Sequence, residues 1–159
     1  MPWFFRVVRR RRRHRTPAPG QTLYKLHKET ARVCVERKLA EWNELFGFRY
    51  GRVAIRNSKT RWGSCSRAGN LNFNYKVIFL PEKLFDYVIV HELAHLAEFN
   101  HSPAFWQTVA RAIPDWHARR NALRKHRIVV PRKPLEPDII TPPHPRPLPA
   151  SAVSSSMSA

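Results

Sequence analysis

The sequence predicts a small α+β domain, in which a long first helix is followed by about three short strands and then by further helices. Three observations predict this class. Apolar residues recur at helical spacing between 22 and 46, and they alternate with polar residues between 71 and 77. A third stretch, 82–98, is apolar on nearly every side and contains His91-Glu92-Leu93-Ala94-His95. We therefore expect a buried helix that carries polar groups.

Composition divides the 159 residues into one domain and two arms. Residues 1–20 hold seven arginines and no acidic residue, and residues 131–159 hold eight prolines followed by small polar residues. Neither stretch buries enough apolar area to offset the entropy of ordering, so we expect two disordered arms and a folded domain at 21–130. The domain holds 19 basic and 9 acidic residues. With the arginine arm, it should attract nucleic acid without reading its sequence.

The elements of the domain follow in order along the chain. The first helix should end at Gly47, because glycine adopts the left-handed conformation that commonly follows a helix. Strands are expected at 49–57, 61–66 and 71–77, and a hairpin-like connection over 67–70 joins the second to the third.

The third strand should have one buried and one solvated face, because its apolar and polar residues alternate. Asn72 and Asn74 fall on the solvated face, where they are candidates to line a substrate cleft. An ordinary solvated strand face is the alternative interpretation.

Three helices complete the domain, at about 82–98, 103–112 and 116–127. Ser102 and Asp115 are placed to cap the second and third of these helices, and Pro103 suits a first helical position.

His91 and His95 are the centre of the functional hypothesis. Residues four apart lie on the same face of a helix, so the two imidazoles can bind a single Zn²⁺ ion. Glu92 lies one step round the helix, where it can act as a general base on a water held by the metal. Without a metal, such polar groups in a buried helix would be unfavourable.

A third ligand is required, because a catalytic zinc normally has three protein ligands and one open position. We expect His101, since Asn100-His101-Ser102-Pro103 supplies a turn, with a left-handed asparagine, that brings the chain back. Glu98 and His117 are the alternatives. Glu98 lies on the helical face of His91, but roughly 10 Å along the axis, which suits a tetrahedral site poorly.

The compartment is predicted from the cysteines and from the absence of a long apolar run. Cys34 and Cys65 form no Cys-x-x-Cys pair, which favours a reducing environment. No apolar run reaches the ~18 residues needed to cross a bilayer, and the order of apolar and basic residues at the start is the reverse of a secretory signal. We expect a cytoplasmic protein without a membrane partner. No feature defines its oligomeric state.

A series of motifs runs from about Tyr24 to Arg127. They are Lys59-Thr60-Arg61-Trp62-Gly63-Ser64-Cys65-Ser66, Asn70-Leu71-Asn72-Phe73-Asn74, Asp86-Tyr87-Val88, His91-Glu92-Leu93-Ala94-His95, Asn100-His101-Ser102 and Phe105-Trp106. The series resembles that of the YgjP-like metallopeptidase-domain proteins. The resemblance implies a small zincin-like domain with an active-site helix, one zinc ion and a third histidine in the Asn-His-Ser segment. It is also similar in outline to SprT-like and WLM-type proteases, which act on proteins bound to DNA.

Several residues of these motifs have open interpretations. Arg61 is a candidate to bind a substrate carboxylate or phosphate, or to pair with an acidic neighbour. Trp62 is interpreted as core, with a place in the site as the alternative, and Gly63 as a bulge or a close backbone approach. Metzincin proteases have a glycine where this chain has Glu98, so we expect the helix to continue further here.

We predict a zinc-dependent hydrolase, a metallopeptidase in which Glu92 activates a zinc-bound water, with a peptide or protein as substrate. The alternatives are a metal-dependent nucleoside triphosphate pyrophosphatase, as one member of the resembling group has been described, and a zinc-bearing protein that associates with nucleic acid. The intact glutamate disfavours the latter, since a structural zinc site needs no base. Neither oxygen-rich ligands for Mg²⁺ nor a glycine-rich phosphate loop is present, which disfavours the pyrophosphatase.

Overall fold

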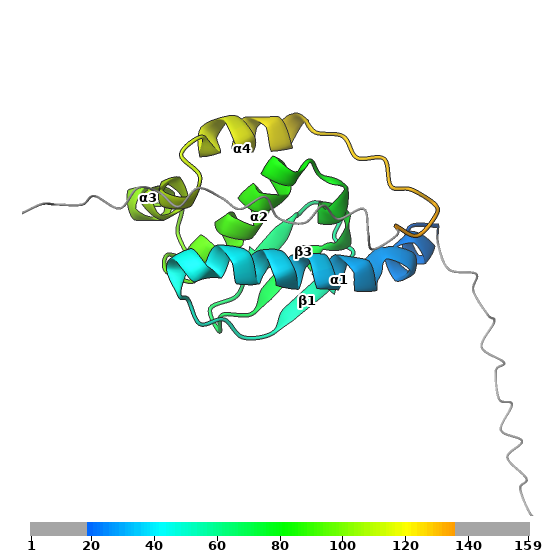
Figure 1. The fold of residues 1–159 in the computed structure, drawn as a ribbon, viewed down its shortest axis with the longest axis horizontal. Coiled ribbons are helices and arrows are strands. Elements are labelled where there is room, and N and C mark those ends of the chain that lie inside the picture. The colour runs from blue at the N-terminus through cyan, green and yellow to red at the C-terminus, as the bar shows by residue number, and fades with distance from the viewer. Residues whose placement is uncertain (1–18, 136–159) are drawn as a thin grey trace, which may run out of the picture.

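A computed structural model of the protein describes residues 19–135 (Figure 1). Predictions for residues 1–18 and 136–159, most of the two arms, lie outside the described residues. The elements are α1 (Pro19–Phe46), β1 (Val53–Arg56), β2 (Gly63–Cys65), β3 (Leu71–Asn74), the 3₁₀ helix η1 (Tyr75–Phe79), α2 (Glu82–Ala94), α3 (Pro103–Ala112) and α4 (Trp116–Lys125). This order confirms the α+β class.

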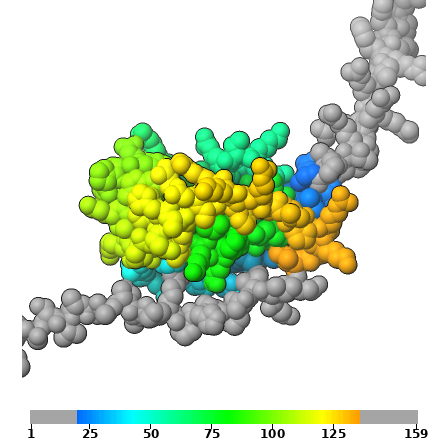
Figure 2. Space-filling view, turned by 90° about the horizontal axis from the view of Figure 1, so that it is seen from above, coloured from blue at the N-terminus to red at the C-terminus, as the bar shows by residue number. Residues whose placement is uncertain are grey.

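The helix α2 lies at the centre of the molecule, where α1 packs on one side of it and α4 on another (Figure 1). α3 and β2 also contact α2, and nearly all of its residues from Leu84 onward are buried. Figure 2 shows the face formed by α3 and α4, which continues into residues 126–135. A helix that is apolar on nearly every side thus has a neighbour on nearly every side.

The three described strands form one mixed sheet in the order β1-β3-β2. β1 runs parallel to β3, with Val53 opposite Leu71, and β2 runs antiparallel to β3, with Gly63 opposite Phe73. The predicted hairpin-like connection between β2 and β3 is confirmed. It closes through a hydrogen bond from Ser66 N to Asn70 O, and Gly69 takes a positive φ of 72°.

The third strand is shorter than predicted, because it ends at Asn74 and η1 follows. The Asn74 side chain caps η1 by accepting a hydrogen bond from Lys76 N, and its Nδ2 donates to Ser58 O and Arg61 O. Asn74 is therefore buried, and its prediction on a solvated face is wrong. The alternation of apolar and polar residues over 71–77 gave too long a strand, because Tyr75 and Val77 are buried in the 3₁₀ helix as they would be in a strand. The pattern of apolar residues therefore does not mark where the strand ends.

The helix ends agree with the sequence in most places. Gly47 ends α1 with a φ of 64°, and the Ser102 hydroxyl caps α3 by accepting from Phe105 N. Asp115 is the N-cap residue of α4, but its carboxylate forms an ion pair with Arg119 Nε at 2.9 Å and makes no cap hydrogen bond, contrary to expectation.

A buried ion pair ties α1 to the first turns of α2. Lys38 is 5 % exposed, and its ammonium lies 2.8 Å from Glu82 Oε1 and 3.0 Å from Asp86 Oδ1. Trp42 Nε1 donates to the same Asp86 oxygen at 3.0 Å. Because these contacts span both helices, they set the rotation of α2 about its axis and hence the direction of the side chains one and two turns further on.

The packed part of the chain extends slightly beyond the limits expected for the domain. α1 begins at Pro19, and the fully buried His27 donates from Nε2 to the carbonyl oxygen of Pro131 at 2.8 Å. The segment after α4 therefore returns to α1. None of the helices within residues 19–135 combines the length and the apolar character that a bilayer crossing requires.

Candidate metal centre

His91 and His95 lie at the end of α2, which stops four residues earlier than predicted. The helix ends at Ala94 and His95 is its C-cap. Leu96 N donates to Leu93 O, and Glu98 N donates to Ala94 O, so the last turn tightens and the chain reverses. The expectation that the helix continues to Glu98 is wrong. The expected left-handed Asn100 is also wrong, since the residues with positive φ in the described chain are glycines.

The reversal brings His101 to the two helical histidines. The ligand atoms of His91, His95 and His101 lie within 4.8 Å of one another. His91 Nε2 and His101 Nε2 are 3.2 Å apart. Two nitrogens that bind one zinc ion at about 2.0–2.1 Å in a tetrahedron are separated by about 3.3–3.4 Å. The arrangement therefore fits a single zinc ion.

The hydrogen bonding of His95 prepares it to bind a metal. Its Nδ1 lies 3.1 Å from the carbonyl oxygen of Glu98, which can only accept, so the proton is on Nδ1. Nε2 then keeps its lone pair, as a zinc ligand requires. Glu98 thus supports the centre through its backbone, while its carboxylate accepts from Asn100 N.

The surroundings of His91 and His95 favour their neutral forms. Burial, followed by the neighbouring His95 and His101, lowers the pKa of His91 to about 3, and burial also lowers the pKa of His95. A neutral imidazole is the form that binds a metal. Phe105, fully buried, packs against all three rings at centroid distances between 4.6 and 5.0 Å.

Glu92 follows His91 on α2, lines the same cleft and is 5 % exposed. Burial raises the pKa of its carboxyl to about 8, against the opposing charge of Arg61. Within the described residues its Oε2 has no hydrogen-bond partner. A buried carboxyl with a raised pKa and an unused oxygen is typical of an acid–base group.

Gly63 makes room for this carboxyl group. A Cβ at position 63 would lie 2.5 Å from Glu92 Oε1 and 2.6 Å from Cδ. No side chain is tolerated at that distance unless Glu92 moves. The close approach that the sequence offered as one interpretation of Gly63 is therefore confirmed, and its neighbour is the Glu92 side chain.

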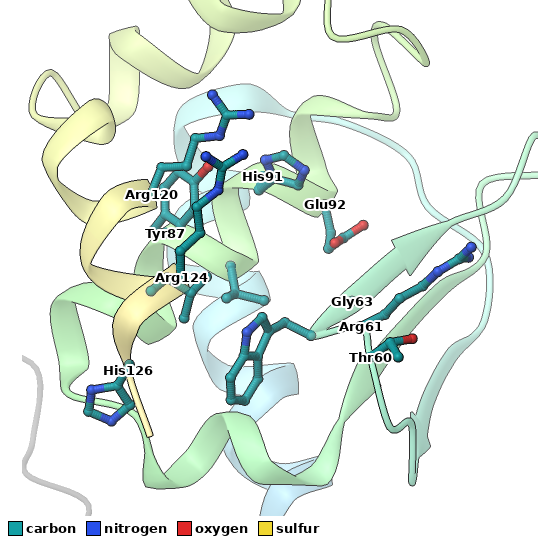
Figure 3. Close-up of a pocket in the computed structure, with 12 residues that line it drawn as sticks. Thr60, Arg61, Gly63, Tyr87, His91, Glu92, Arg120, Arg124 and His126 are labelled. Atoms are coloured by element: carbon teal, nitrogen blue, oxygen red, sulfur yellow. The ribbon is translucent and has the colours of Figure 1, made fainter. Parts of the chain in front are cut away.

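A cleft of about 510 Å³ opens in front of His91 and Glu92 (Figure 3). Its lining comes from the segment before β2 and the first residue of β2, from α2, and from α4 and the residue that follows α4. The lining residues are Thr60, Arg61, Trp62, Gly63, Tyr87, Val88, His91, Glu92, Arg120, Leu123, Arg124 and His126.

The three predicted substrate-binding residues lie differently with respect to this cleft. Arg61 lines it, although Figure 3 shows its side chain directed away from Arg120 and Arg124. Asn72 and Asn74 line smaller hollows over the sheet, where Asn72 accepts from Arg56 Nε at 3.2 Å. A substrate contact by any of the three stays a prediction.

The alternative third ligands are placed elsewhere. Glu98 and His117 are not among the residues that gather with His91 in the described chain. His117 is exposed and stacks on Trp116 at 3.5 Å.

The sequence interpretation missed Arg120 and Arg124. Their signal was a spacing of four on a predicted helix, which places both on one face.

The chain is similar to known metallopeptidases. The model of one family, described as "YgjP-like, metallopeptidase domain", matches residues 6–126. The solved structure of abylysin, a metallopeptidase zymogen of Pyrococcus abyssi, is 27% identical, covers 56% of this chain and 90% of its own, and has a TM-score of 0.51. The zymogen jannalysin of Methanocaldococcus jannaschii, at 19% identity, covers 57% and 94% with the same TM-score, and supports the fold. Among curated proteins, no match is found.

Proposed function

Because this chain belongs to the YgjP-like metallopeptidase-domain family, we propose that it is a zinc-dependent peptidase in which Glu92 is the general base. One observation carries the proposal. Three imidazoles converge within 4.8 Å, and the buried carboxyl group of Glu92, which has an unused oxygen, follows the first of them on α2 at the edge of an open cleft. The three imidazoles and the separate carboxyl group match the ligand set and the base of a catalytic zinc site.

His91, His95 and His101 would hold the metal. All three donors are nitrogens, and imidazole suits Zn²⁺ whereas Mg²⁺ prefers oxygen. When bound, zinc supplies a Lewis acid that polarises a peptide carbonyl and lowers the pKa of a water molecule.

Glu92 would move the protons of the reaction. Its position next to His91 on α2 lets the carboxylate accept a proton from the attacking water and later deliver one to the leaving amine. Gly63 keeps the space in which Oε1 lies, so the carboxyl group is not displaced toward the metal ligands. Burial excludes bulk water that would otherwise compete for the same proton.

Strand β2 offers the substrate a place to bind in extended form. In the described sheet β2 lies at an edge, with β3 as its partner on the inner side, and Gly63 at its start lines the cleft. A peptide added along the outer edge would pass Glu92. Main-chain hydrogen bonds of this kind bind a backbone with little dependence on its side chains.

A side-by-side assay tests this proposal. The zinc-loaded full chain and its Glu92→Gln variant are incubated with a degenerate peptide library and with nucleoside triphosphates. We expect peptide cleavage by the wild type, and a rate lower by roughly two to four orders of magnitude in the variant, the usual contribution of a positioned acid–base group. Hydrolysis of the triphosphates without peptide cleavage would show that the metal serves a phosphohydrolase.

A further inference from the structure

Two arginines on α4 face the metal centre across the cleft. Arg120 and Arg124 are four residues apart, one above the other on the helix, and both line the cleft with His91 and Glu92. In Figure 3 their side chains rise beside the ring of Tyr87, and their guanidinium groups lie on the side of His91. Two fixed positive charges therefore stand next to the place where the proposed function puts the scissile bond.

These arginines have no acidic partner in the described chain. The ion pairs formed by arginines there involve Arg32, Arg37 and Arg119. Arg120 lies 5.1 Å from the ring of Trp106, which orients its guanidinium group without neutralising it. Both charges also act on Tyr87, where they oppose the burial that raises its pKa to about 12. The donors of both arginines thus remain available to a ligand.

On these grounds, and on the proposed function, we propose that Arg120 and Arg124 bind a carboxylate group of the peptide substrate close to the scissile bond. A guanidinium group donates two parallel hydrogen bonds to a carboxylate, so one or both arginines can bind it in a fixed orientation. The carboxylate comes either from an aspartate or glutamate side chain or from the free C-terminus of the substrate.

The shape of the cleft favours a peptide group over a polyanion. Its volume of about 510 Å³ suits one or two amino-acid residues, and Trp62, Val88 and Leu123 supply apolar walls. Glu92 lies at one end, where an acidic group offers no counter-charge to the further phosphates of a nucleotide. A single carboxylate at the α4 side satisfies both arginines and stays away from Glu92.

Matched peptides test this inference. Three of them, blocked at both ends, carry Glu, Gln or Lys at the position beside the mapped cleavage site. A fourth carries Gln and has a free C-terminus. At physiological ionic strength, where general attraction to a basic protein is screened, we expect kcat/KM for the Glu peptide or the free-acid peptide to exceed that of the blocked Gln peptide by about tenfold or more. Which of the two is preferred identifies the source of the carboxylate.

The variants Arg120→Gln and Arg124→Gln should reduce this preference to about threefold or less, and Arg124→Glu should shift it toward the Lys peptide. The matched control is Lys125→Gln, which removes the same charge from the next residue of α4, outside the lining of the cleft. The control should retain the full preference. Equal rates for the Glu, free-acid and blocked Gln peptides, or a preference unchanged in both arginine variants, would overturn the inference.

Binding to the zinc-loaded Glu92→Gln variant separates this inference from the proposed function. If the wild type cleaves no peptide, the proposed function fails, and the site is then judged by affinity alone. Tighter binding of the peptides that carry a carboxylate, lost on adding Arg124→Gln but not Lys125→Gln, would uphold the site. Equal affinity for the blocked Glu, free-acid and blocked Gln peptides, or binding of ATP instead, would reject it.

Discussion

At the N-terminal end of α2, Asp86 lies buried between Lys38 and Trp42, and each of these polar groups has a partner. At the C-terminal end of the same helix, Glu92 is buried and His91 is half-buried, but Glu92 Oε2 and His91 Nδ1 have no hydrogen-bond partner within the described residues. Buried polar groups that serve the fold are satisfied by the fold. The unused Glu92 oxygen at the C-terminal end is available for a proton and a substrate, and His91 Nε2, which lies 3.2 Å from His101 Nε2, is available for a metal.

Among changes that leave the catalytic and ligand residues in place, the largest expected effect comes from adding a methyl group beside Glu92 at the C-terminal end of α2. In Gly63→Ala the new Cβ would lie 2.5 Å from Glu92 Oε1, so the carboxyl group must move by about 1 Å. Misplacement of that size lowers turnover by roughly tenfold to a hundredfold. Steady-state kinetics should show the loss in kcat, and metal analysis should show unchanged zinc content.

Gly20→Ala is the control for this substitution, because nothing lies within 4 Å of a Cβ at position 20. Equal activity of the two alanine variants would show that Gly63 does not position Glu92.

A second substitution removes a partner at the N-terminal end of α2, where the buried polar groups are paired. Lys38→Met keeps most of the length of the side chain but leaves Asp86 buried with Trp42 as its remaining described partner. Since the partly solvated Glu82 shares the ammonium, we expect a loss of about 2–3 kcal/mol in the free energy of unfolding, below the full value for a buried pair. Denaturant unfolding measures the loss. Zinc affinity of the folded variant should be unchanged, and a weakened zinc site would mean that the two ends are coupled.

From the sequence, the grouping of the residues at the candidate metal centre could be predicted more reliably than the residues at which the helices and strands end. His91, Glu92 and His95 are neighbours through helical spacing alone, and His101 follows from a turn only a few residues later. The ends of β3 and α2 were misplaced because Tyr75 continues the apolar alternation and because neither Gly nor Pro marks the stop after Ala94. The spacing of Arg120 and Arg124 places them on one face of a helix, but it does not say what that face packs against. They line the cleft because α4 packs on α2, and no local sequence pattern predicts that packing.

The smallest effect is expected from shortening the chain. A protein of residues 19–135 retains α1 from its first residue and the bond from His27 to the Pro131 carbonyl. Its thermal stability and zinc content should match those of the full chain. Ending the protein at residue 130 removes the Pro131 carbonyl that accepts from the buried His27 imidazole, so we expect the free energy of unfolding to fall by about 1 kcal/mol. A large loss of thermal stability or zinc content in the 19–135 protein would show that one of the arms packs on the domain.

The central claim is that three histidines hold the metal while Glu92 handles protons, and metal analysis of purified variants tests it most directly. Glu92→Gln and Glu98→Ala should each retain about one zinc per chain, because the first leaves every ligand in place and the second keeps the carbonyl that orients His95. His101→Ala should lose most of its zinc. If Glu98→Ala emptied the site while His101→Ala stayed loaded, the account of this centre would be wrong.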